Sequence, residues 1–162
     1  MNNSKRKLNY ICFILLTLIL FFLVYTLLNT VYFENFVKCT DPKIEEIVSD
    51  LTPLFNNPKF QKILKNNNKN LKHISNLSFY KGKRSYTLNK QDIYICLKDN
   101  NKKYYENNML LHVLLHELTH AIVNDIGHTD YFWKQFDEIL KIAHELKIYD
   151  MDIPLVKDYC IL

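Results

Sequence analysis

Hydrophobic side chains change their spacing several times along this chain, and each change predicts a different element. Residues 8–33 contain no charged side chain, and Ile11 to Leu28 are almost continuously apolar. At 1.5 Å per residue, Ile11 to Leu28 would form a helix of about 27 Å, close to the hydrocarbon thickness of a bilayer. The pattern predicts an uncleaved transmembrane anchor. The alternative is a cleaved signal peptide, which would have a shorter apolar region and a small-residue cleavage site that Thr26 to Thr30 does not offer.

The charges on either side of this apolar run indicate its orientation. Residues 5–7 are all cationic, whereas Glu34 and Lys38 balance each other after the run. By the positive-inside rule the N-terminus stays cytosolic, and the rest of the chain lies on the opposite side of the membrane. The opposite orientation remains open, because so few charges are counted. We therefore expect a single-pass membrane protein in which 1–38 form a tail, anchor and linker, and 39–162 form one folded domain.

Helical periodicity begins directly after the predicted linker. Asp41 and Pro42 make a favourable helix start, since Asp is a good capping residue and Pro suits the first helical turn. Apolar residues then recur at helical spacing from Ile44 to Phe55. Pro58 starts a second short helix, which the Asn-rich stretch 66–70 ends. These segments predict a small helical layer before the central part of the domain.

Three short stretches then show the composition of strands. Leu77–Tyr80, Ser85–Leu88 and Ile93–Leu97 are rich in β-branched and aromatic residues. Gly82 and Asn89 lie in the turn-like segments between them. We expect a short antiparallel sheet, followed by two long helices. The fold class is therefore predicted to be α+β.

The first of these long helices, predicted at 106–125, carries the chemistry. It is apolar nearly all round, so we expect it to be buried. It contains the pattern His116-Glu117-Leu118-Thr119-His120, in which the two histidines lie one helical turn apart on the same face. Buried polar groups need partners, and a zinc ion would provide one for both imidazoles. Glu117 would then act as general base on a zinc-bound water.

A catalytic zinc site usually has three protein ligands, and His128 is the best candidate for the third. It directly follows Gly127, which we expect to cap the helix and turn the chain back toward the metal. His112 lies one turn before His116, but three successive histidines span about 12 Å, too far for one ion. We therefore assign His112 to packing or to an indirect contact. A surface His128 and hydrogen-bonded core histidines are the alternatives.

Several other residues enter with smaller roles. Thr129 or Asp130 can cap the second long helix, whose apolar face begins with Phe132 and Trp133. Asp130 could instead orient a ligand imidazole. Tyr131 or Tyr159 could stabilise an oxyanion. His73 has no partner pattern and is expected at the surface.

Charge and cysteine content narrow the function classes. The net charge of +4 is spread along the chain, and no basic stripe is interleaved with aromatic residues, so nucleic-acid binding is unlikely. The four cysteines form no C-x-x-C pair, which argues against a cysteine-type zinc finger. Cys12 lies in the apolar run, and Cys39, Cys96 and Cys160 cannot all pair within one molecule. Their disulfide state stays open.

The motif residues resemble a known family. His116 to His120, followed by Gly127-His128 and Phe132-Trp133, looks like the WLM and SprT-like zinc metallopeptidases of the zincin group. The segment from Ser85 to Tyr105 looks particularly like small members encoded by large DNA viruses. The likeness covers about residues 77–160. It implies a zincin-like fold, bound Zn²⁺ held by the three histidines at 116, 120 and 128, and peptide-bond hydrolysis with Glu117 as catalytic acid and base.

The sequence thus predicts a membrane-anchored zinc metallopeptidase that acts on a protein or peptide substrate. Ile93–Leu97 is the candidate edge strand for pairing with an extended substrate. One alternative is a membrane-anchored zinc-binding or interaction protein without catalysis, for which Glu117 is not needed. Another is a core helix with incidental histidines, which binds no metal.

Overall fold

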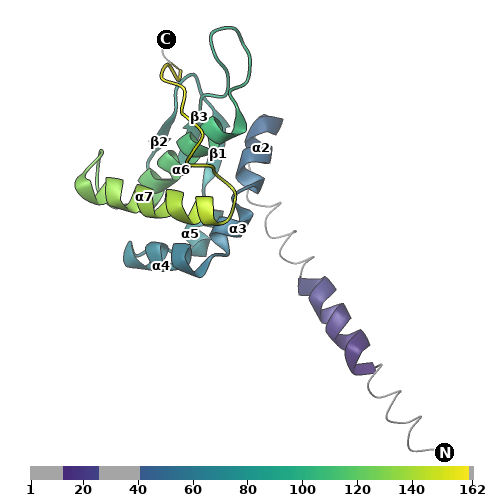
Figure 1. Ribbon diagram of the computed structural model, residues 1–162. Coiled ribbons are helices and arrows are strands. Elements are labelled where there is room, and N and C mark those ends of the chain that lie inside the picture. The colour runs from purple at the N-terminus through teal and green to yellow at the C-terminus, as the bar shows by residue number, and fades with distance from the viewer. Residues whose placement is uncertain (1–12, 26–40, 161–162) are drawn as a thin grey trace, which may run out of the picture. The chain divides into compact units, whose positions relative to one another are not determined.

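The structure is a computed structural model, and it describes residues 13–25 and 41–160 (Figure 1). The chain divides into two units, Met1–Asn35 and Phe36–Leu162. In the first unit, residues 13–25 are helical and their side chains are exposed. The predicted boundary between 38 and 39 falls among residues that the structure does not describe.

The prediction of a single-pass membrane protein is wrong, because the structure contains no suitable helix among the residues that it describes. Within 13–25 and 41–160, no helix is both long and apolar enough to cross a bilayer. The other residues of the predicted span, 8–12 and 26–33, lie outside the described part of the chain.

Four short helices open the second unit. They are α2 (Pro42–Ser49), α3 (Thr52–Phe55), α4 (Pro58–Asn66) and α5 (Leu71–Ser75). Asp41 caps α2, as expected, by accepting a hydrogen bond from the backbone N–H of Lys43 at 3.0 Å. Asn57 caps α4 in the same way through the N–H of Lys59 at 2.8 Å. Each helix buries its apolar face in the core of this unit.

A three-stranded sheet follows, made of β1 (Ser78–Lys81), β2 (Tyr86–Leu88) and β3 (Asp92–Ile95). Its strand order is β1-β3-β2, in which β3 runs parallel to β1 and antiparallel to β2. The expected fold class, α+β, is confirmed, but the expectation of an antiparallel sheet is wrong for β1 and β3. The reason is that the chain after β1 crosses to the far edge before a tight turn brings it back into the middle.

This strand order also overturns the candidate for substrate pairing. Most of the predicted edge strand, Ile93–Leu97, belongs to β3, which hydrogen-bonds to a neighbour on both sides. The strands at the two edges are β1 and β2, each of which pairs only with β3 among the described residues. Of the two, β2 lies beside the predicted site, since the Thr87 hydroxyl is 2.8 Å from Glu117 Oε2. An edge available to an incoming peptide therefore belongs to β2.

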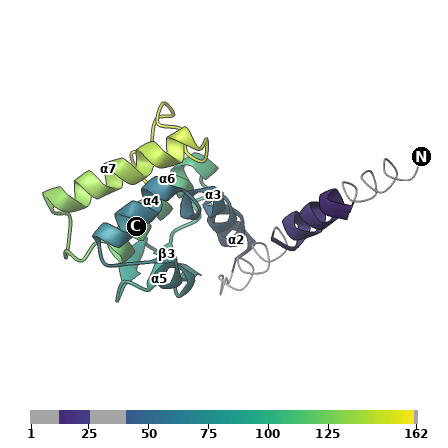
Figure 2. The ribbon, with the colours of Figure 1, turned by 90° about the horizontal axis from the view of Figure 1, so that it is seen from below.

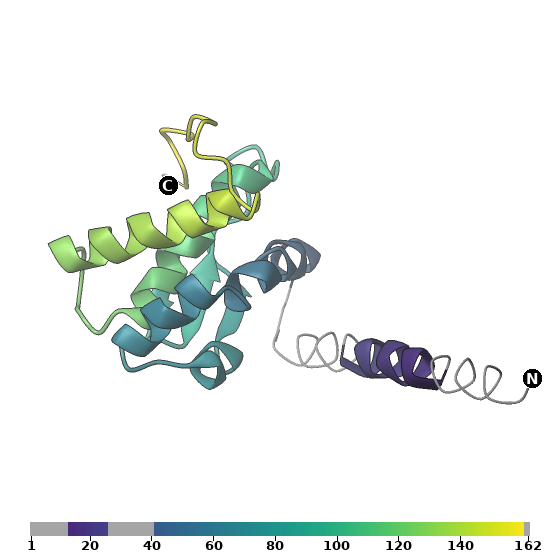
Figure 3. The same cartoon turned by 60° about the horizontal axis from the view of Figure 1, so that its bottom comes forward.

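Two long helices, α6 (Asn107–Ile122) and α7 (Asp130–Glu145), complete the domain. Helix α6 is buried, and it contacts the sheet as well as α7. Helix α4 lies beside α7, as Figures 1 and 2 both show, and the Lys59 ammonium lies 2.6 Å from the Glu145 carboxylate. After α7 the chain leaves as an irregular tail (Figure 3), whose residues 150–158 are all exposed. Helix α6 is thus held from several directions, which makes it a rigid base for a site.

Candidate metal centre

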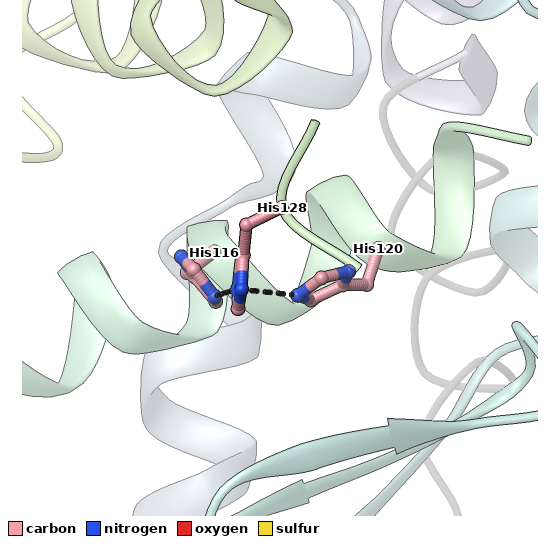
Figure 4. A group of neighbouring side chains, drawn as sticks. All are labelled: His116, His120 and His128. Atoms are coloured by element: carbon pink, nitrogen blue, oxygen red, sulfur yellow. Dashed lines mark hydrogen bonds between the residues drawn. The ribbon is translucent and has the colours of Figure 1, made fainter. Parts of the chain in front are cut away.

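Three histidines that are separate in the sequence meet beside α6 (Figure 4). His116 and His120 project from successive turns of α6, and His128 comes from the loop between α6 and α7. The Nε2 atom of His128 lies 2.9 Å from Nε2 of His116 and 3.1 Å from Nε2 of His120. The three candidate ligand atoms all lie within 4.8 Å of one another. The structure therefore brings together the three histidines that the sequence singled out.

These distances suit a metal ion. Zinc–nitrogen bonds of about 2.0 to 2.1 Å in a tetrahedral arrangement separate two ligand nitrogens by about 3.3 Å. Neutral imidazoles have one donor and one acceptor nitrogen each, so three converging nitrogens cannot all satisfy one another by hydrogen bonds. A cation among them would satisfy all three lone pairs at once. The residues present fit a zinc ion with three nitrogen ligands and an open fourth position.

The electrostatic surroundings keep the imidazoles on α6 neutral. Burial lowers the pKa of His116 to about 3, and the neighbouring histidines add to this effect. Burial, again with the charge of neighbouring groups, lowers the pKa of His120 to about 4. Metal binding requires deprotonated ligands. Around neutral pH these two side chains therefore present lone pairs without first having to lose a proton.

The loop that carries His128 is held by the ammonium group of Lys90, from the turn between β2 and β3. Helix α6 ends at Ile122, earlier than predicted, because Val123 already has an extended backbone. Lys90 Nζ donates hydrogen bonds to the carbonyl oxygens of His120, Val123 and Asp125, at 3.0, 2.6 and 2.9 Å. These three bonds use all the donors of one ammonium and lie at the negative end of the helix dipole.

Gly127 then turns the chain just before His128. Its φ of +77° lies in the left-handed region, where a side chain is unfavourable. An added Cβ would meet nothing within 4 Å, so the need for glycine is conformational and not a matter of space. Gly127 is thus part of the loop and not the helix cap that the sequence suggested.

Aromatic rings at the start of α7 pack against the imidazoles. Phe132 stacks on His120 with ring centroids 4.3 Å apart, and Trp133 stacks on His128 at 5.2 Å. Thr129 caps α7 by accepting a hydrogen bond from the N–H of Phe132 at 3.1 Å, so Asp130 is the first helical residue and not the cap. The sequence places Phe132 and Trp133 on an apolar helix face and in the family-like motif, but indicates no contact with the histidines. In the structure they restrict how two of the three imidazoles rotate.

Glu117 lies on α6 next to His116 and is only 5% exposed. The hydroxyl oxygen of Thr87, on strand β2, lies 2.8 Å from both the Glu117 carbonyl oxygen and Oε2, and its single proton can be donated to either. Burial raises the pKa of Glu117 to about 7, although the Thr87 hydrogen bond acts in the other direction. A carboxyl group that titrates near neutral pH is well suited to take up and return a proton.

Two cavities open onto this group of residues. The larger, of about 610 Å³, is a cleft between β2 and the histidine loop. Its lining includes Thr87, Lys90, His116, Glu117, His120 and His128. A second cavity of about 360 Å³ extends toward the N-terminal end of α6, where His112 and Val113 line it, and its lining also includes His116 and Glu117. Both the histidines and the carboxylate are therefore within reach of a molecule in the cleft.

The remaining candidates contribute no atom to the group of three histidines. His112 places its Nδ1 atom 3.1 Å from the Tyr149 hydroxyl and packs edge-on against Phe136, in keeping with its expected packing role. His73 was expected at the surface, but it is half-buried, and its Nε2–H donates to the Ala121 carbonyl at 3.0 Å. The Tyr131 hydroxyl donates to Asn67 Oδ1 at 3.2 Å, outside both cavities. Tyr159 does line the second cavity.

Sequence reasoning missed two residues that support the site. Thr87 and Lys90 come from the β2 edge and the turn after it, about 30 positions before the groups that they contact. Lys90 has a positive φ of 56°, as does its neighbour Asn89 at 50°, which indicates a tight hairpin turn. A turn at this place was expected, but no periodicity or spacing links it to α6.

Comparisons with known proteins agree with a viral context and reveal little about activity. No protein-family model matches the chain. An uncharacterized protein, 136R of Invertebrate iridescent virus 6, is 38% identical over 58% of this chain and 53% of its own length. Another, 042R of Invertebrate iridescent virus 3, is 43% identical over 55% of this chain and 57% of its own. The matched segments thus span about half the length of these relatives.

One solved structure shows a weaker likeness. A crystal structure of a Wss1 mutant from Saccharomyces cerevisiae aligns with 70% of this chain and 97% of its own, with a TM-score of 0.42 and 15% identity. What the site does is therefore inferred from its own geometry. A small mixed α+β domain with relatives in viruses presents a histidine cluster that could hold a metal ion.

Proposed function

We propose that this protein is a zinc-dependent metallopeptidase that hydrolyses peptide bonds in a protein or peptide substrate. The observation that carries the proposal is the convergence of three imidazole nitrogens at 2.9 and 3.1 Å beside a buried carboxyl group. His116, His120 and His128 would hold the ion, and the cleft of about 610 Å³ leaves a side of it open to substrate. An open coordination position is typical of catalytic and not of structural zinc sites.

Glu117 is the proposed general base and acid. Bound zinc would supply a Lewis acid that polarises the scissile carbonyl and makes a water molecule acidic enough to ionise near neutral pH. Glu117 takes up the proton of the attacking water and returns it to the leaving amine. Thr87 holds the carboxyl group through its hydroxyl, so the proton acceptor keeps one orientation toward the cleft.

Strand β2 is the proposed docking edge for the substrate backbone. It lies at the edge of the sheet, and Tyr86 and Thr87 line the cleft next to His116 and Glu117. An extended peptide can add a strand to such an edge through main-chain hydrogen bonds. A peptide paired with β2 would run along the cleft and bring a backbone carbonyl to the histidines.

Metal analysis and a cleavage assay on the full chain test this proposal. Wild-type protein is expected to retain about one zinc ion per chain and to cleave labelled casein. His128→Ala should lose zinc, whereas His144→Ala, which changes an exposed histidine on α7, should retain it. Absence of zinc from the wild type after reconstitution would refute the proposal.

The role of Glu117 needs a separate comparison. Glu117→Gln should retain zinc and lose cleavage by at least about a hundredfold, because general acid–base catalysis contributes about that much or more. Glu45→Gln, which changes an exposed carboxylate on α2, is the matched control and should leave cleavage unchanged. Bound zinc with no cleavage by the wild type would instead leave a non-catalytic zinc-binding protein.

A further inference from the structure

The C-terminal tail is fastened to the domain at its far end. Residues 150–158 are exposed, but the next two residues are half-buried. Cys160 forms a disulfide with Cys96, which directly follows strand β3. The disulfide settles a pairing that the sequence left open. It also draws the end of the tail back over the sheet, toward the side of α6 that carries His112 and His116.

Tyr159 is held in one place by this attachment and by hydrogen bonds. Its hydroxyl donates to the Cys96 carbonyl oxygen at 2.5 Å and lies 2.8 Å from Ser85 Oγ. Ser85 Oγ in turn accepts from the N–H of Cys96 at 2.9 Å. The Tyr159 ring packs against Tyr105 with centroids 4.8 Å apart, and the Tyr105 hydroxyl accepts from the Cys160 N–H at 3.0 Å. The ring of Tyr159 is therefore fixed although the tail before it is exposed.

The fixed ring forms one side of the second cavity. This cavity has a volume of about 360 Å³. Helix α6 contributes His112, Val113, His116 and Glu117, the segment before β2 contributes Arg84 and Ser85, and the tail contributes Tyr159 and Cys160. Because His116 and Glu117 also line the cleft with the metal centre, the cavity adjoins the place where the scissile bond would lie.

We propose that this cavity receives the substrate side chain next to the scissile bond, and that Tyr159 is a specificity-determining residue held in place by the Cys96–Cys160 disulfide. The inference rests on the proposed peptidase function. Tyr159 acts as a wall and not as an oxyanion donor, because its hydroxyl proton is already donated to the Cys96 carbonyl. Tyr159 thus limits the size of the substrate side chain that the cavity can hold, and the cavity would hold larger substrate side chains if Tyr159 were removed.

A positional-scanning library of internally quenched peptides tests the assignment on the zinc-loaded full chain. Tyr159→Ala removes the wall but leaves the disulfide. The double variant Cys96→Ser/Cys160→Ser frees the tail but leaves the ring. Both should shift the preference at the same single substrate position toward larger side chains, by about tenfold or more in relative kcat/KM, the range for gain or loss of pocket contacts.

The kinetic pattern separates a specificity role from general damage. For a peptide with a small side chain at that position, KM should rise while kcat changes little, since only uniform binding is lost. Val156→Ala, an exposed position on the same tail, should keep the wild-type profile and zinc content. Tyr159→Phe should also keep the wild-type profile, because it retains the ring and the disulfide.

An unchanged profile in Tyr159→Ala would overturn the inference, whether or not the double variant folds. Failure of the proposed function would look different. If the wild type binds zinc but cleaves no peptide, the same labelled peptides are titrated against Glu117→Gln with and without Tyr159→Ala. A tenfold difference in peptide Kd between the two proteins, for the same substrate side chains, would support the side-chain pocket while rejecting hydrolysis. Equal Kd values in the two proteins would reject the pocket as well.

Discussion

Lys90 offers a direct test of how the sheet supports the metal centre. Its ammonium group donates to three carbonyl oxygens at the end of α6 and in the loop that leads to His128. Lys90→Met keeps the length and apolar part of the side chain and removes only the charge and its hydrogen bonds. The substitution leaves three carbonyls to be satisfied by water and removes a cation from the negative end of the helix dipole.

The expected loss in the free energy of unfolding follows from these contacts. A hydrogen bond to a charged group contributes about 1.5 to 3 kcal/mol when it is buried, and a partly buried cation at a helix C-terminus contributes up to about 2 kcal/mol. Lys90 is half-buried, so water can replace part of each bond. We therefore expect a total loss of about 2 kcal/mol, at the low end of these contributions.

The same substitution should weaken metal binding. The loop from Val123 to Gly127 would no longer be tied to the turn after β2, so His128 would be less well placed relative to His116 and His120. Loss of groups that orient metal ligands typically costs about 10-fold to 100-fold in affinity. Zinc affinity is measured by competition with a chromophoric chelator, and stability by urea unfolding of the metal-free protein.

Lys83→Met is the control, because Lys83 is exposed and lies in the connection before β2, whereas Lys90 lies in the turn after it. It should leave both zinc affinity and the urea midpoint unchanged. If Lys90→Met bound zinc as tightly as the wild type, other contacts such as the hydrogen bond from Thr129 to Asp125 and the stacking of Trp133 on His128 would be enough to hold the loop, and our reasoning about Lys90 would be refuted.

Three further predictions address the other supporting contacts. Thr87→Val should lower kcat about tenfold at unchanged zinc content, because Glu117 loses the hydroxyl that orients it. Thr87→Ser keeps the hydroxyl and should have the wild-type kcat, so equal rates for the two variants would contradict this role of Thr87. The Cys96–Cys160 disulfide closes a loop with a sequence separation of 64. Removing it should lower the free energy of unfolding, measured by urea titration, by about 4 kcal/mol. A loss below about 1 kcal/mol would show that the disulfide constrains the unfolded chain little. Burial raises the pKa of Tyr159 to about 12 from a usual value of 10.0, so its contribution to stability is present below pH 10 and is lost as the pH rises toward 12. Wild type should therefore lose more stability over that interval than Tyr159→Phe, and parallel curves would exclude the buried hydroxyl as the cause.

Local features of the sequence were sufficient to locate the histidines. The spacing of His116 and His120 places both imidazoles on one helical face wherever the helix packs, because a helix turn is a local structure. Gly127 is a local signal of the same kind, since a left-handed residue next to His128 is needed to turn the chain. The helix itself could be predicted from its apolar periodicity, although its last residues were placed too far along the chain.

Tertiary structure decided the features that depend on distant partners. The strand order could not be predicted, because the three strands have similar composition and only their packing places β3 in the middle. That order moved the proposed substrate edge from β3 to β2 and brought Thr87 to Glu117. The anchor predicted from hydrophobicity alone was likewise overturned, since no helix within 13–25 and 41–160 is long and apolar enough to cross a bilayer.

The same distinction applies to the second cavity. Tyr159 and Ser85 are 74 positions apart, and no repeat or motif in the sequence relates them. They meet because the disulfide and the hydrogen bonds around Cys96 stabilise one path of the tail among many. The sequence by itself therefore determined which groups could bind the metal, since their spacing is set within a few residues. Only the folded chain decided what orients those groups and what surrounds the substrate, because such contacts gain their free energy from the packing of the whole domain.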